Sequence, residues 1–97
     1  MRLHPELETY RDRLVERAGA WPDTPEVDLR RDLAQCEAQT ALLEKGIDAL
    51  RARLESGPAT ESEVLAHRVS IQEQMRDLTA AYAEVLRRHV EKLPAKA

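Results

Sequence analysis

Between Leu29 and Leu54, apolar or small side chains recur at alternating spacings of 4 and 3 residues. The positions are Leu29, Leu33, Cys36, Thr40, Leu43, Ile47, Leu50 and Leu54. A helix with this pattern carries one narrow apolar stripe, which it buries against a partner helix. The pattern therefore predicts a coiled-coil-like helix over residues 25–55.

The same period returns after a break at Gly57 and Pro58, and it predicts a second long helix over residues 61–93. Its stripe consists of Val64, Arg68, Ile71, Met75, Leu78, Tyr82, Val85 and His89. Thr60 and Glu63 have the spacing of a capping box at the start of this helix. Because the connection is short, the two helices are expected to be antiparallel. Matching their stripes puts Ile47 opposite Ile71 and Cys36 opposite Tyr82.

A third, shorter helix is predicted over residues 5–19, where Leu7, Tyr10 and Leu14 share one face. The turn at Trp21–Pro25 folds it back along the first half of the helix at 25–55, which places Leu14 near Leu33. The fold class is therefore all-α: a long antiparallel helical hairpin with a short N-terminal helix packed on its open end. We expect one helical domain, 1–97, with a tail at 94–97.

Composition narrows the classes of function. The 97 residues are 42% apolar, 34% charged and 3% aromatic, and the net charge is −3. Nucleic-acid binding is not expected, because basic and acidic residues alternate and no basic excess exists. No apolar run is long enough for a membrane span, and no secretory signal is recognisable. The single Cys36 fits a reducing, cytoplasmic setting.

Candidate chemistry is sparse. His4, His67, His89 and Cys36 lack the paired spacing of a metal site, so no metal or other cofactor is expected. Cys36 lies on the inward stripe, where a thiol is unreactive. With no catalytic motif and little room for a pocket, the chain is not expected to be an enzyme.

Two residues keep alternative interpretations. Arg68 occupies an inward position, so either its stem packs while its head reaches solvent, or it faces a partner. Trp21 either caps the three-helix core or is an exposed anchor for a partner.

The half of the hairpin near its turn has no third helix to cover it. The residues predicted as a partner interface there are Ile47, Leu50, Leu54, Leu65, Arg68, Val69 and Ile71, with Leu65 and Val69 expected beside the stripe. We therefore expect a non-enzymatic protein–protein interaction module, such as an adaptor, small chaperone or inhibitor. One alternative is a structural homo-oligomer, a dimer that forms a four-helix or larger bundle. A more remote one, a small helical enzyme or ligand-binding bundle, requires an inward polar cluster that the pattern does not provide.

Overall fold

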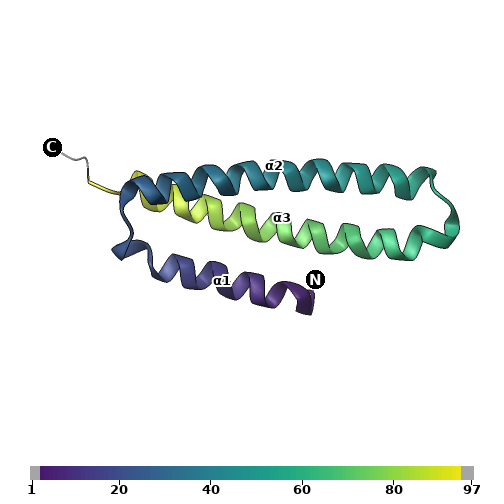
Figure 1. The fold of residues 1–97 in the computed structure, drawn as a ribbon, viewed down its shortest axis with the longest axis horizontal. Coiled ribbons are helices and arrows are strands. Elements are labelled where there is room, and N and C mark those ends of the chain that lie inside the picture. Colours follow the sequence, from purple (N-terminus) through teal and green to yellow (C-terminus); the bar gives the residue numbers. More distant parts are fainter. Residues whose placement is uncertain (1–2, 95–97) are drawn as a thin grey trace.

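The computed structural model describes residues 3–94, in which three short 3₁₀ helices alternate with three α-helices (Figure 1). The elements are η1 (Pro5–Leu7), α1 (Glu8–Gly19), η2 (Trp21–Asp23), α2 (Glu26–Ser56), η3 (Ala59–Glu61) and α3 (Ser62–Glu91). The long helices α2 and α3 form an antiparallel hairpin, and α1 packs on its open end. The predicted all-α fold is confirmed, and the molecule is elongated, with extents of 61 × 23 × 17 Å.

The start of α3 differs from the predicted one. The expected capping box of Thr60 and Glu63 is wrong, because η3 precedes the helix and Glu61 is the N-cap, without a side-chain capping hydrogen bond. Ser62 instead donates its hydroxyl to the carbonyl of Ala59 at 2.8 Å, inside the 3₁₀ turn. The chain thus enters α3 through a tighter helical turn rather than through an extended cap.

The stripe of α2 lies where the sequence predicts it. Leu29, Cys36 and Ile47 are its buried residues, and each belongs to the predicted set. These side chains project toward α3 along most of the length of the hairpin. The spacing of apolar residues in α2 therefore locates the buried face correctly.

The stripe of α3 that faces α2 is displaced by one residue from the predicted one. Its buried residues, apart from Tyr82, are Leu65, Val69, Thr79, Ala83, Leu86 and Val90. Gln72 lies on this stripe, and its Oε1 would be 3.1 Å from a Cβ added to Gly46 on α2. The predicted inward positions Val64, Arg68 and Val85 are exposed. The prediction that Leu65 and Val69 lie beside the stripe is also wrong.

The physical reason for the displacement is that α3 packs against two helices. The expected placement of α1 along α2 is incomplete, because η1 and α1 lie chiefly on α3. His4 contacts Ser70, and Tyr10 is hydrogen-bonded to Thr79, so α1 and α3 run in the same direction. The more apolar stripe of α3, which the periodicity detects, turns partly toward α1.

A three-helix core forms at the open end of the hairpin. Its buried members are Leu14, Trp21, Leu29, Cys36, Tyr82, Ala83, Leu86 and Val90. Tyr10, Leu33 and Leu93 pack against it from partly exposed positions. This core contains residues from α1, η2, α2 and α3, so it ties the N-terminal segment to the hairpin.

The turn between the long helices requires a glycine at position 57. The amide of Gly57 donates to the carbonyl of Arg53 at 2.7 Å, and a Cβ on Gly57 would lie only 2.5 Å from that oxygen. Its φ of −86° is open to any residue, so the requirement comes from this close approach rather than from a left-handed conformation.

We expect Gly57→Ala to lower the free energy of unfolding by about 1–3 kcal/mol, because the methyl group must displace backbone atoms. Gly19→Ala is the matched control: nothing lies within 4 Å of a Cβ there, and alanine in a helix is favoured over glycine by about 0.5–1 kcal/mol. Urea titrations followed by circular dichroism measure both changes. Equal effects of the two substitutions would contradict the clash.

Candidate functional site

The structure separates the seven predicted interface residues into three groups. Ile47, Leu65 and Val69 are buried. Leu50, Leu54 and Ile71 are half-buried, and Arg68 is exposed. The first group belongs to the hairpin's own core, so only the other four side chains are available on the surface of the chain.

These four residues share the turn-proximal half of the hairpin with Val64, whose side chain is 62% exposed. Val64, Arg68 and Ile71 lie on one side of α3, because residues four and seven apart share a helix face. We define the tip face as Leu50, Leu54, Val64, Arg68 and Ile71. A hollow of about 230 Å³ opens beside Val64 and Arg68 and also touches Arg53 and Glu61.

The described part of the N-terminal segment does not reach the tip face. The backbone amide of His4 donates to Oε1 of Gln74 at 2.9 Å, and its ring Nε2 lies 3.0 Å from the hydroxyl of Ser70. The rings of His4 and His67 meet edge to face, with centroids 5.1 Å apart. The described part of the N-terminal segment therefore ends over this stretch of α3, and Val64 lies beyond it.

The charges of the tip face are only weakly engaged. Arg53 and Glu61 approach to 3.8 Å across the turn, with both side chains largely exposed. Arg68 makes no ion pair with any residue between positions 3 and 94. The tip face thus combines exposed apolar groups with an uncompensated guanidinium.

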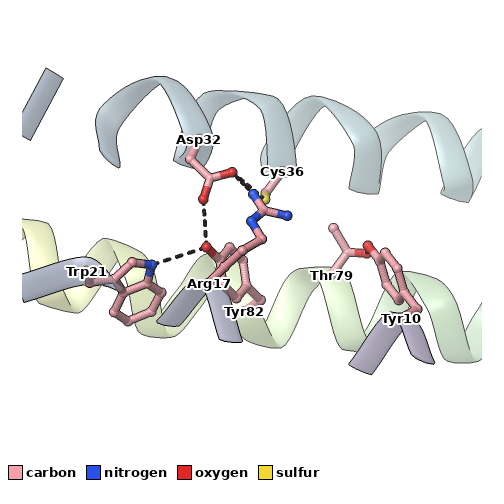
Figure 2. Close-up of polar contacts among 7 residues, drawn as sticks. All are labelled: Tyr10, Arg17, Trp21, Asp32, Cys36, Thr79 and Tyr82. Atoms are coloured by element: carbon pink, nitrogen blue, oxygen red, sulfur yellow. Dashed lines mark hydrogen bonds and ion pairs between the residues drawn. The ribbon is translucent and has the colours of Figure 1, made fainter. Parts of the chain in front are cut away.

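A polar network lies at the opposite, open end of the bundle, and the sequence pattern did not predict it (Figure 2). The Tyr82 hydroxyl accepts a hydrogen bond from the indole N–H of Trp21 at 3.1 Å and donates to Asp32 at 2.6 Å. Arg17 forms an ion pair with the other oxygen of Asp32, and its guanidinium carbon lies 4.9 Å from the centre of the Tyr82 ring. The signal that could have located it is the predicted pairing of Cys36 with Tyr82, since Asp32 precedes Cys36 by one helical turn.

The network also settles the role of Trp21. Its side chain is buried, and its ring packs against those of Tyr82 and His89, with centroids 5.4 and 5.2 Å away. Trp21 therefore caps the three-helix core rather than projecting into solvent.

The groups of this network are already engaged with one another. Both oxygens of Asp32 accept bonds, and the Tyr82 hydroxyl uses its proton and a lone pair. The Cys36 sulfur lies 3.7 Å from Asp32, and burial raises the pKa of its thiol, an effect that Arg17 opposes only in part. A thiol with a raised pKa stays protonated near neutral pH. The arrangement stabilises the core and offers no activated nucleophile.

The described residues contain neither a candidate metal-binding cluster nor a candidate membrane-spanning helix. No group of three His, Cys, Asp or Glu side chains within 3–94 could hold a metal ion. In the same part of the chain, no helix combines the length and apolarity that a membrane span needs.

Comparison of the chain with protein-family models, with curated proteins and with solved structures finds no match.

We expect Tyr82→Phe to lower the free energy of unfolding by about 1–3 kcal/mol, because it leaves the buried Trp21 N–H without an acceptor. Tyr10→Phe is the control: Tyr10 is hydrogen-bonded to Thr79 at 2.5 Å, but Thr79 still donates to the Met75 carbonyl without it. Its cost should stay at about 0.5–1.5 kcal/mol. Urea unfolding of both variants tests the difference, and a smaller loss for Tyr82→Phe would refute the assignment.

We expect alkylation of Cys36 by iodoacetamide at pH 8 to be at least about tenfold slower in the folded chain than in urea, because burial and a raised pKa both suppress the thiolate. The raised pKa also links stability to pH. The thiol's contribution is complete below the unfolded pKa and is lost as pH rises toward the folded one. Mass spectrometry of the labelled chain gives the rates, and equal rates in both states would exclude a protected thiol.

Proposed function

We propose that this chain is a non-enzymatic protein–protein interaction module, an adaptor, small chaperone or inhibitor that presents the tip face to a helix of another protein. One observation carries the proposal: Val64 and Arg68 are exposed on the part of α3 that lies beyond the N-terminal end of η1. An apolar face left open between two helices is the surface into which an amphipathic helix docks.

The absence of reactive groups at the tip face supports binding rather than catalysis. Its side chains are aliphatic apart from Arg68, and the hollow beside them is lined by the weakly paired Arg53 and Glu61. A general acid, base or nucleophile needs an environment that shifts its pKa. The one cysteine lies in the three-helix core at the other end of the hairpin.

The charge of Arg68 indicates the chemistry of the partner. Its guanidinium lacks an ion-pair partner within residues 3–94 and stands one helical turn from Val64 and from Ile71. A partner helix with apolar residues on one face and a carboxylate at its edge would bury the aliphatic groups and pair with this charge. The tip face therefore favours an acidic amphipathic helix.

A photo-crosslinking amino acid at position 64 tests the proposal in the cell that makes the protein. We expect a discrete crosslinked partner at this position and none at position 27, because Val27 is exposed to 63% on α2 and is a matched surface site. Arg68→Glu should reduce the crosslinked product at least about tenfold, since it reverses the charge that pairs with the partner.

Arg13→Glu, a charge reversal at an exposed position of α1, is the control and should leave the product unchanged. Thermal melting verifies that each variant is folded. Equal products at positions 27 and 64, or a product indifferent to Arg68→Glu, would exclude the tip face as the binding surface.

A further inference from the structure

A second surface, separate from the tip face, lies where α1 and α3 run side by side. On the side of Tyr82 that faces α1, a groove of about 240 Å³ is bounded by Val15 and Ala18 of α1 and by Ala81 and Val85 of α3. It continues past Ala81 into a second hollow of about 390 Å³ that reaches Leu3 and Asp77. The two hollows share Leu78 and Ala81, so they form one continuous trough.

The two banks of the trough alternate large and small side chains. Val15 and Val85 are exposed to 66% and 55%. Ala18 follows Val15 by one turn on α1, and Ala81 precedes Val85 by one turn on α3. Each helix therefore lines its side of the trough with one projecting valine and, one turn away, with an alanine that leaves a hollow.

The relative height of the banks follows from the contacts between the helices. His4 contacts Ser70 and Tyr10 contacts Thr79, offsets of 66 and 69 residues between parallel helices. The mean of these offsets places Val15 within two residues of the height of Ala81, and Ala18 within one residue of the height of Val85. Each projecting valine thus stands closer in height to the alanine of the other helix than to its valine.

The rims carry opposite charges at similar heights. Arg11 borders the trough on α1, and Asp77 borders it on α3. Among residues 3–94, each is engaged by the neighbouring residue of its own helix: Arg11 lies 3.4 Å from Asp12, and Asp77 lies 3.0 Å from Arg76. Such exposed contacts contribute little, so both charges can exchange partners at small cost.

A trough whose two banks complement each other in shape and charge is complementary to itself. A two-fold axis parallel to the trough sets α1 of one copy against α3 of the other at unchanged height, so Val15 meets Ala81, Val85 meets Ala18, and Arg11 meets Asp77. We infer that the occupant of the trough is a second copy of this chain, in an isologous dimer. This interface differs from a pairing of the turn-proximal halves, because it lies along the trough between α1 and α3.

Sedimentation equilibrium of the full chain over about two orders of magnitude in concentration tests the inference. We expect a mass approaching twice that of the chain. Val85→Asp should weaken association at least about tenfold, because it buries a carboxylate in an apolar contact. Val27→Asp, at an equally exposed position on α2, should leave it unchanged.

Charge exchange gives the sharper test. Arg11→Asp and Asp77→Arg should each weaken the dimer, because each sets like charges across the axis twice, and the double variant should restore it. A wild-type chain that stays monomeric, a dimer indifferent to Val85→Asp, or a double variant weaker than both single variants would overturn the inference. Val85→Asp leaves the residues of the tip face unchanged, so crosslinking from position 64 in this variant tests the tip face apart from the dimer.

Discussion

The hydrogen bonds of the Tyr82 hydroxyl hold the helices together at the open end of the bundle. It joins η2 through Trp21 and α2 through Asp32, and Asp32 in turn engages Arg17 on α1. Residues of α1, η2 and α2 are therefore linked through one buried tyrosine of α3. Because an unpaired buried donor or acceptor costs more than a single hydrogen bond contributes, this network disfavours other placements of α1. Apolar contacts alone would allow α1 to slide or roll along the hairpin, since they lack direction.

The helices and their boundaries could be predicted from periodicity, prolines and glycine, but the rotation of α3 could not. One stripe of α3 contains Val64, Ile71, Leu78 and Val85, and the neighbouring stripe contains Thr79 and Ala83 among its buried residues. Periodicity selects the more apolar stripe. In the structure, the neighbouring stripe packs against α2. Its small side chains allow close approach of the long helices, and the hydroxyl of Thr79 is hydrogen-bonded to the Met75 carbonyl and to Tyr10. A shift of one residue rotates a helix by about 100°, which is why Leu65 and Val69 are buried and Arg68 is exposed.

The same rotation explains how much of the candidate surface the sequence could locate. The turn-proximal half was found because the length of α1 follows from the proline-rich turn, and a helix of 12 residues cannot cover one of 30. Within that half, Ile47 is buried and Leu50 is half-buried, although both lie on the predicted stripe of α2. Their degree of exposure depends on the rotation of α3. The trough between α1 and α3 lay outside any prediction that placed α1 along α2. The pattern predicts no role for Val15 and an inward position for Val85, although each is exposed by more than half.

The direction of the proposed two-fold axis relates the trough to the tip face. An axis parallel to α1 and α3 keeps the helices of both copies pointing the same way, so both turns emerge at one end of the dimer. Each tip face would then be presented beside its equivalent, at a separation fixed by two rigid hairpins rather than by a flexible linker. Two adjacent sites that are held at a constant distance raise the effective concentration for a partner with two matching helices, whereas a monomeric partner gains nothing. Dimerisation through the trough would thus select bivalent partners without adding any contact at the tip face itself.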